Sequence, residues 1–515
     1  MHTAKSLRIS WAVAWLAPLL MTALVGASDE SSQLDVGCVL TSASPMPSVA
    51  TLSGQTDIRS RIAVVDLAKL NEVRDAGGGL LTLNLFDDAN FRAMVERVST
   101  HPNGYSLAGP LDGIEHGRFN LVVHDNVTVG IVRAGQDGTY NMRYLGNGTH
   151  VVRQIDPAAF PSCGVTPQST QHLHDRISPN PGDESSRAAP GSDSDASRSA
   201  DDGGVHDILV LYSSVTREAA GGTAAIRAEI QLAIDVANDA YDLSSVVSRL
   251  RLAHMEEVAY DEVTGWDGYV DHLLRLGVPD DGYFDYIHEL RDRIGADFVS
   301  MIVEDTDPDV LGNGTCGMAP IMQELSPDFE VLAFSVVSRE CAGDNWSLVH
   351  EVGHNQGCAH DRDNASNEGL YSYSYGYHLT GNTRGWSTIM AYDDAENNWQ
   401  RFGQFSNPYW MHDGAATGVH IGSPGEAHNA ATINNSRFLI AGFRTTRYWV
   451  DFDWSGTEDG LFDTPYSRLI EGIAEVPEGG MVVVKSGSTS DGLTLAKRVK
   501  INSWNGSTII GAASP

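Results

Sequence analysis

The stretch HEVGHNQGCAHD, residues 350–361, constrains this chain more than any other feature. On a helix, His350 and His354 lie four residues apart, so both imidazole rings project from one face and can reach one metal ion. Glu351 lies beside the first histidine and suits a general base acting on a metal-activated water. Gly357 lets the helix end and the chain turn back, which would bring His360 to the same ion. The spacing predicts a three-histidine metal site.

Zinc is the metal that this set of ligands favours. Three neutral histidines leave a fourth position open for water, which is typical of a catalytic rather than a structural zinc site. Sites rich in soft thiolates do not fit these residues. Zinc-bound water would attack a carbonyl while Glu351 takes its proton and later returns it to the leaving amine. A helix that merely contains histidines is the competing interpretation, and the long pattern HExxHxxGxxHD disfavours it.

A second segment, STIMAY at residues 387–392, places Met390 downstream of the third histidine. Together, HEVGHNQGCAHD and STIMAY resemble the metzincin zinc endopeptidases, and the terminal HD resembles the reprolysin (adamalysin) branch in its secreted bacterial form. The segments DILVLYSSVTREAAGG (207–222), GTCGMAPIM (314–322), FGQFSNP (402–408) and 427–444 are also similar to that branch. The resemblance covers roughly residues 206–447, and residues 60–165 resemble the family's propeptide.

The resemblance implies a role for each matching residue. His350, His354 and His360 would be zinc ligands, Glu351 the base, and Met390 the floor of the site. The residues that would support the site are Gly357, Asp361 and Tyr392. The residues that would line the wall of a specificity pocket are Phe405, Ser406, Asn407 and Pro408. A protein or peptide substrate would dock on an edge strand at 331–338 by backbone pairing. Structural calcium is common in such relatives, but no loop here has a clear ligand rhythm.

The pattern along the chain predicts several units. Residues 1–27 read as a signal peptide, because Lys5 and Arg8 precede an apolar run and small residues follow it. Residues 28–166 are β-rich, apart from a helix-like period at 91–98. Residues 167–204 are rich in Ser, Asp, Pro and Gly, so we expect a disordered linker and the activation region. Residues 205–447 alternate strands with helices, which predicts an α/β (α+β) metzincin domain with a mixed twisted sheet.

The remaining segment, 448–515, shows short alternating strands with Gly and Asn at the turns. It resembles the opening rungs of a parallel β-helix, and a small β-sandwich is the alternative. A role in surface attachment would follow by analogy. The net charge of −33 argues against nucleic acid as a partner. No stretch after the signal peptide is long and apolar enough to span a membrane, so we expect a secreted, extracellular protein.

The five cysteines leave several pairings open. A straight helix would separate Cys341 from Cys358 too widely for a disulfide, so Cys316 is expected to pair with one of them. Cys163, in FPSCGV, has two interpretations. It pairs with Cys38, or it acts as a cysteine switch of the kind that the resemblance implies, in which its thiolate takes the open zinc position.

The sequence as a whole predicts a secreted zinc endopeptidase made as a zymogen that its own propeptide inhibits. Two alternatives belong to other classes of function. One is a catalytically silent adhesion or binding protein with this fold, which the intact Glu351 disfavours. The other is a zinc hydrolase acting on a non-peptide substrate, which the expected edge strand disfavours.

Overall fold

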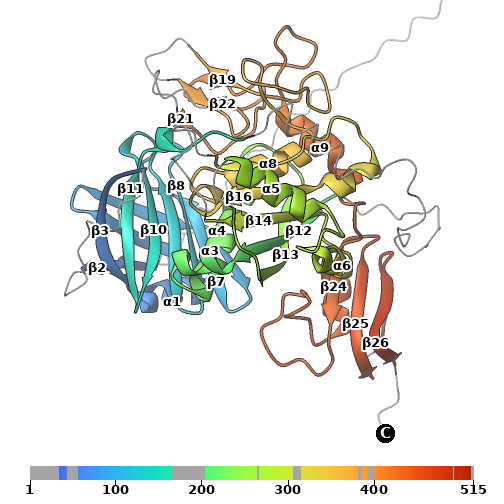
Figure 1. The fold of residues 1–515 in the computed structure, drawn as a ribbon. Coiled ribbons are helices and arrows are strands. Elements are labelled where there is room, and N and C mark those ends of the chain that lie inside the picture. The colour runs from blue at the N-terminus through green and yellow to red at the C-terminus, as the bar shows by residue number, and fades with distance from the viewer. Residues whose placement is uncertain are drawn as a thin grey trace, which may run out of the picture.

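The structure is a computed structural model that describes residues 34–42, 56–164, 203–263, 266–304, 315–380, 385–392, 400–490 and 492–511. The expected signal peptide and nearly all of the expected linker lie outside these residues. We call residues 34–164 the N-terminal region, residues 203–446 the central region and residues 447–511 the C-terminal region (Figure 1). The β-rich N-terminal region and the mixed α/β central region agree with the sequence prediction.

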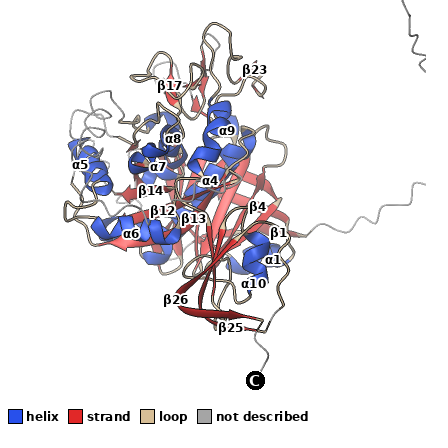
Figure 2. Ribbon diagram, turned by 90° about the vertical axis from the view of Figure 1, so that its right-hand side faces the viewer, coloured by secondary structure: helices blue, strands red, loops and turns tan. Residues whose placement is uncertain are grey.

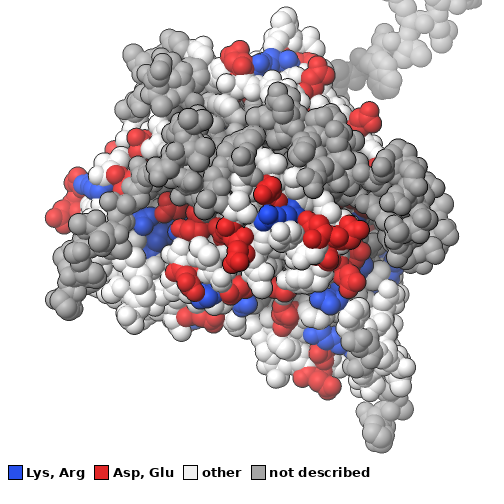
Figure 3. All heavy atoms as spheres, viewed as in Figure 1, with Lys and Arg blue, Asp and Glu red and all other residues white. Residues whose placement is uncertain are grey.

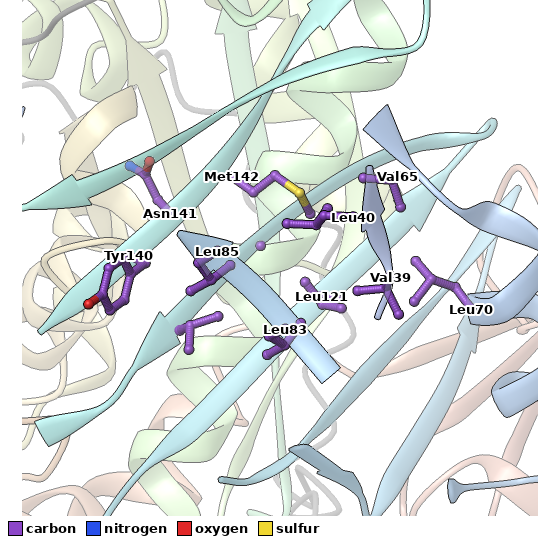
Figure 4. Close-up of a pocket in the computed structure, with 12 residues that line it drawn as sticks. Val39, Leu40, Val65, Leu70, Leu83, Leu85, Leu121, Tyr140, Asn141 and Met142 are labelled. Atoms are coloured by element: carbon purple, nitrogen blue, oxygen red, sulfur yellow. The ribbon is translucent and has the colours of Figure 1, made fainter. Parts of the chain in front are cut away.

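Within its described residues, the N-terminal region contains a sheet with the order β2-β3-β11-β10-β9-β8-β7-β6 and a smaller sheet with the order β1-β4-β5. Leu83, Leu121 and Met142 line a small apolar cavity in its core (Figure 4). The elements are β1 (Asp35–Cys38), β2 (Leu40–Ser42), β3 (Asp57–Val65), α1 (Leu67–Asp75), β4 (Gly79–Phe86), β5 (Ala89–Val95), β6 (Arg97–His101), β7 (Gly104–Pro110), β8 (Arg118–His124), β9 (Val127–Arg133), η2 (Gly135–Asp137), β10 (Thr139–Gly146), β11 (Thr149–Ile155) and η3 (Pro157–Ala159).

The helix predicted for residues 91–98 was wrong, because this stretch forms most of β5 and the start of β6. Phe91, Ala93 and Val95 are buried, while Arg92 between them is exposed. This alternation has the period of two that a half-buried strand requires. Pairing of β5 with β4 and burial of one face therefore decide the structure here.

Strand β8 buries both of its faces against different partners. Phe119 and Leu121 point into the core of the N-terminal region. Val122, the residue after Leu121, joins the core of the central region, together with Val129 and Ile131 of β9. This second face packs against helix α4 (Thr223–Leu243). The N-terminal region is therefore continuous with the core that supports the central region.

Charged groups flank this apolar contact, with arginines on the N-terminal side and carboxylates on the central side. The Arg143 Nη2 atom lies 2.7 Å from Asp344 Oδ1, and both side chains are buried. Asn141 Nδ2 donates a hydrogen bond of 2.6 Å to Asp344 Oδ2. The same arrangement recurs in Arg97–Asp239, Arg118–Asp239 and Arg153–Glu340. The contact between the two regions is thus apolar at its centre and ion-paired around it.

The central region is built on a sheet with the order β13-β12-β14-β16-β15, in which only β15 is antiparallel to its neighbour. Helices α4, α7 and α8 lie together beside its strands (Figure 2). The elements are β12 (Val205–Ser213), α3 (Ser214–Ala220), α4, β13 (Arg249–Val258), α5 (Trp266–Gly277), α6 (Asp285–Ile294), β14 (Phe298–Val303), β15 (Gly317–Met318), η4 (Pro327–Leu332), β16 (Phe334–Ser338), α7 (Arg339–Ala342) and α8 (Ser347–Asn355).

The expected edge strand at residues 331–338 was wrong in two respects. Residues 327–332 form η4, so the strand begins only at Phe334. Strand β16 is also covered by β15, which pairs with it through Gly317 and Met318. A strand of two residues leaves no periodic pattern in the sequence. Among the described residues, the edge of this sheet is therefore β15.

After α8 the chain forms short ladders and a closing helix. These are β17 (Ala359–Asp361), β18 (Tyr375–Gly376), β19 (His378–Leu379), β20 (Trp386–Ser387), β21 (Gln400–Arg401), β22 (Met411–His412), β23 (Ala415–Ala416) and α9 (Asn429–Ile440). Strand β17 pairs with β18, and β20 pairs with both β19 and β21. Strands β19 and β22 lie at one end of the molecule, above α8 in the view of Figure 1, and α9 lies beside α8.

The C-terminal region contains three parallel strands, β24 (Arg447–Val450), β25 (Met481–Thr489) and β26 (Lys500–Ile510), and the helix α10 (Leu469–Glu475). Val450, Ile473, Val482 and Val484 form its small core. His254 of β13 contacts this region through Asp463, at 2.9 Å. Carboxylates are spread over the face of the molecule seen in Figure 3, in keeping with the net charge of −33. Among the described residues, no helix is both long enough and apolar enough to cross a membrane.

Candidate metal centre

Helix α8 carries the first two histidines of the motif, and their ring nitrogens converge on the third. The Nε2 atom of His360 lies 3.2 Å from that of His350 and 3.1 Å from that of His354. Zinc–nitrogen bonds of about 2.0–2.1 Å in a tetrahedral site separate ligand atoms by about 3.3 Å. Both distances match this spacing, and all three nitrogens lie within 4.8 Å of one another, as a single metal ion requires.

Backbone carbonyls hold the Nδ1 atoms of His350 and His354 in place. His350 Nδ1–H donates to the Ile389 carbonyl oxygen at 2.7 Å, and His354 Nδ1–H donates to that of Cys358 at 2.8 Å. Each bond places the proton on Nδ1 and leaves the Nε2 lone pair for a metal. Burial lowers the pKa of His354 to about 4 and the pKa values of His350 and His360 well below 6.5. The rings are thus neutral, as metal ligands must be.

Gly357 and Met390 shape the site around this helix. Gly357 has a φ of +96°, and a Cβ atom there would lie 2.6 Å from Leu370 Cβ, so the turn after α8 requires glycine. The turn leads into β17, which carries His360. Met390 lies beneath the helix, because a Cβ atom on Gly353 would meet its Sδ atom at 2.8 Å. The residue before it, Ile389, supplies the carbonyl that holds His350.

Asp361 ties the third histidine to the turn that contains Met390. Its Oδ2 atom accepts the backbone N–H of Tyr392 at 3.0 Å, and its Oδ1 atom accepts that of Asp363 at 3.1 Å. The Tyr392 ring packs on the His360 ring with the centroids 4.4 Å apart. Both residues were predicted to support the site, and both contact it.

Glu351 lies beside the three histidines and is fully buried. Burial raises its pKa to about 8, while a hydrogen bond with Cys163 and the charge of Arg401 act in the opposite direction. A Cβ atom on Gly317 of β15 would lie 2.7 Å from Glu351 Oε1. The backbone of the edge strand therefore passes close to the carboxyl group, and a side chain at residue 317 would displace that group.

Cys163 of the N-terminal region lies at this same site. Its Sγ atom is 3.6 Å from His354 Nε2 and 3.6 Å from Glu351 Oε2. Its ligand atom and those of the three histidines all lie within 4.8 Å of one another. Tyr392 Oη–H donates to the Cys163 carbonyl at 3.0 Å. The four side chains form one group from segments almost 200 residues apart in sequence.

The backbone on either side of Cys163 bonds to the edge of the central sheet. Cys316 N–H donates to the Ser162 carbonyl at 3.1 Å, and Gly164 N–H donates to the Gly317 carbonyl at 2.9 Å. Both segments advance in the same direction along this pair of bonds, so residues 162–164 run parallel to β15. The short segment thus occupies the sheet edge beside the histidines.

The disulfide joins Cys316 to Cys341, with the Cα atoms 5.5 Å apart. This is one of the two pairings that the sequence left open. Cys358 is buried and Cys38 is exposed. The alternative pairing of Cys163 with Cys38 is absent, because the Cys163 sulfur lies among the histidines.

The four residues expected to form a pocket wall are buried behind α8. The Phe405 ring stacks on Tyr241 of α4 at 5.8 Å, and Asn407 Nδ2 donates to the Ser244 carbonyl. Ser406 and Pro408 are also buried. Sequence reasoning did not find Arg401 or Gly317, which lie at the site on strands of two residues each.

A site with these ligands and a buried glutamate defines a metallopeptidase. A family model described as Metallo-peptidase family M12B Reprolysin-like matches residues 204–411. A peptidyl-Asp metalloendopeptidase of Xanthomonas campestris pv. campestris is 31% identical over 346 residues, which cover 67% of this chain and 74% of that protein. A protein of the same name from Stenotrophomonas maltophilia is 28% identical over 331 residues, which cover 63% of this chain and 70% of that protein.

The chain therefore belongs to the reprolysin-like M12B metallopeptidase family, and it is a metalloendopeptidase that requires a metal. A crystal structure of metalloproteinase-II from Bacteroides fragilis aligns with a TM-score of 0.34 and 12% identity, covering 64% of this chain and 92% of that one. A similarity of this size adds nothing to the assignment.

Proposed function

We propose that this chain is a secreted zinc endopeptidase that is made as a zymogen and kept latent by Cys163. The observation that carries the proposal is the Cys163 sulfur at 3.6 Å from both His354 and Glu351. Under this proposal residues 1–27 are a signal peptide, 28–166 the propeptide, 167–204 the activation linker and 205–447 the catalytic unit. The three parallel strands of the C-terminal region favour a β-helix-like attachment segment at 448–515.

In the active state, His350, His354 and His360 would hold zinc through their Nε2 atoms. A bound ion would supply Lewis acidity toward a water and toward the carbonyl oxygen of the scissile peptide. Glu351 accepts the proton of the attacking water and passes it to the leaving amine. The backbone carbonyls of Ile389 and Cys358 keep two of the rings oriented throughout.

Latency in this proposal has two parts. The Cys163 thiol fills the position that the attacking water needs, and zinc binds thiolate strongly. Residues 162–164 also bond to Cys316 and Gly317, the backbone groups that an extended substrate would use at the sheet edge. Removal of the N-terminal region would free both the metal position and the edge strand β15.

The substrate preference follows from the relatives. The similar proteins of Xanthomonas and Stenotrophomonas are named peptidyl-Asp metalloendopeptidases. We therefore assign this chain the same class of substrate, peptide bonds adjacent to aspartate.

Expression of the full chain with zinc tests the proposal. The matured product should begin within or near residues 167–204 when its N-terminus is sequenced, and it should cleave casein. A chelator should abolish cleavage, and zinc should restore it. A product that is fully processed, zinc-loaded and still inactive would instead indicate a silent binding protein.

A further inference from the structure

Arg401 of β21 joins the zinc helix to the turn that contains Met390. Its Nη1 atom donates to the Asn345 carbonyl at 3.2 Å, and its Nη2 atom donates to the Ala391 carbonyl at 3.1 Å. Asn345 lies two residues before α8 begins, and Ala391 directly follows Met390. The guanidinium group is therefore held in place by the two segments that build the metal site.

The charge of Arg401 has no carboxylate partner within ion-pair distance in the part of the chain that the structure describes. Its side chain is buried, since the residue is only 8% exposed. Its two bonds go to neutral carbonyls, and its Nε–H has no partner among the described residues. A buried charge without a counter-ion is costly, so such groups normally bind an anion.

Comparison with other buried arginines of the chain sharpens this point. Arg339 contacts Glu229 and Glu304, as an ion-paired arginine should. Arg291 has only carbonyl partners, but its Nε, Nη1 and Nη2 atoms all donate, so its hydrogen-bonding edges are in use. Arg401 differs from both, because it has neither a carboxylate partner nor a partner for its Nε–H among the described residues.

Arg401 also lies close to the reacting groups. Its Nη2 partner Ala391 precedes Tyr392, whose ring packs on that of His360 with the centroids 4.4 Å apart. Its positive charge also opposes the rise that burial causes in the pKa of Glu351. The short helix η3 of the N-terminal region lies against β21. The N-terminal region therefore reaches the strand that carries Arg401, and its removal would uncover this strand.

We propose that Arg401 is the specificity residue that binds the side-chain carboxylate of a substrate aspartate next to the scissile bond. The Nε–H and a remaining amino N–H lie on one edge of the guanidinium, which matches the two oxygens of a carboxylate. Fixed by Asn345 and Ala391, this edge cannot move to follow longer or neutral side chains. The inference rests on the proposed endopeptidase function and names the acidic side chain as the recognised group.

The test uses matured enzyme and two peptides that differ only by Asp or Asn next to the scissile bond. The wild type should favour the Asp peptide in kcat/KM. The Arg401→Gln variant should lose roughly 10²-fold or more on the Asp peptide, as removal of one partner of a buried charge pair predicts. Its kcat/KM on the Asn peptide should fall by a smaller factor, because the loss of the two backbone bonds affects both peptides alike, so the Asp-to-Asn preference should drop by roughly tenfold or more. The Arg401→Lys variant should retain part of the preference, because it keeps the charge without the fork.

Three results would overturn the inference. One is an equal loss on both peptides, since that is the mark of a purely structural role. Another is an unchanged preference in Arg401→Gln or Arg401→Lys. The third is a wild type that cleaves both peptides equally well, and this measurement decides the matter even if a variant fails to fold. An active but unselective wild type leaves the endopeptidase proposal intact, so the two failures are distinct. The exposed Arg498→Ala variant serves as the control.

Discussion

The sulfur of Cys163 and the Nε2 atom of His354 lie 3.6 Å apart, although 191 residues separate them in the chain. This relationship joins the N-terminal region to the metal centre. It also connects a motif of six residues, FPSCGV, with the motif that begins at His350.

Replacement of Cys163 by alanine should release the site from inhibition. The fourth position would no longer have a thiol, so self-cleavage should begin roughly tenfold faster or more. The measurement is the rate at which the full-length band disappears after zinc is added to purified protein. Cys38→Ala is the matched control, because that thiol is exposed and distant from the histidines. Equal latency of both variants would refute the role of Cys163.

Replacement of Glu351 by glutamine should abolish catalysis but keep the metal. The amide cannot accept the proton of the attacking water, and a positioned base contributes about 10²–10⁴-fold. Because the three histidines are unchanged, the zinc content per chain, measured by atomic absorption, should equal that of the wild type. If activity on a peptide falls by less than about tenfold, another group is the base.

The ion pair of Arg143 with Asp344 should hold the N-terminal region on the central region. Arg143→Ala leaves Asp344 buried without its partner, and such losses cost about 3–5 kcal/mol. In a Glu351→Gln background, which prevents self-digestion, the first unfolding transition in urea should move to lower denaturant. Arg498→Ala breaks an exposed pair with Glu478 and should cost less than about 1 kcal/mol. Similar shifts for the two variants would contradict the prediction.

The contact of His254 with the C-terminal region should weaken in alkali. Burial alone would lower the pKa of His254, but its bonds to Asp463 and Glu256 outweigh burial and raise it to about 9. Because the folded pKa lies above the unfolded value, the stabilisation is complete below about pH 6.5 and is lost as the pH rises to about 9. Its size is at most on the order of 3 kcal/mol.

Thermal unfolding between pH 6 and pH 10, again in the Glu351→Gln background, measures this effect. The melting temperature should fall across the window in the parent and much less in His254→Gln. The exposed His420→Gln variant should keep the fall seen in the parent. A parent whose melting temperature is flat over this range shows that the His254 contact contributes nothing.

The sequence was most informative where binding of one metal ion fixes the spacing between the ligand residues. The interval between His350 and His354, and the glycine before His360, follow from helix geometry and from the need for a turn with positive φ. The structure shows both, with α8 ending at Asn355 and Gly357 at +96°. The position of Cys163 was open in the sequence, since a lone cysteine carries no information about its partner.

Other features could not be predicted because they depend on pairing between distant segments. Phe91, Met94, Val95 and Val98 stand at helical intervals, but Phe91 and Val95 also fit an alternating strand, and pairing with β4 decides between the two. Strand β15 is too short to show any period, so the true sheet edge was missed. Arg401 was missed for the same reason, because its place beside the metal site follows from the short ladder of β20 and β21.

The bonds from residues 162–164 to β15 have a kinetic consequence. While the chain is continuous, Cys163 is tethered to its target, and a tethered group acts at an effective concentration that can reach about millimolar. One cut between residues 164 and 203 turns this internal inhibitor into a separate molecule. Dilution into the surroundings would then complete activation without any further chemistry. Where the cleaved N-terminal region and the enzyme both stay concentrated, the enzyme would remain partly inhibited.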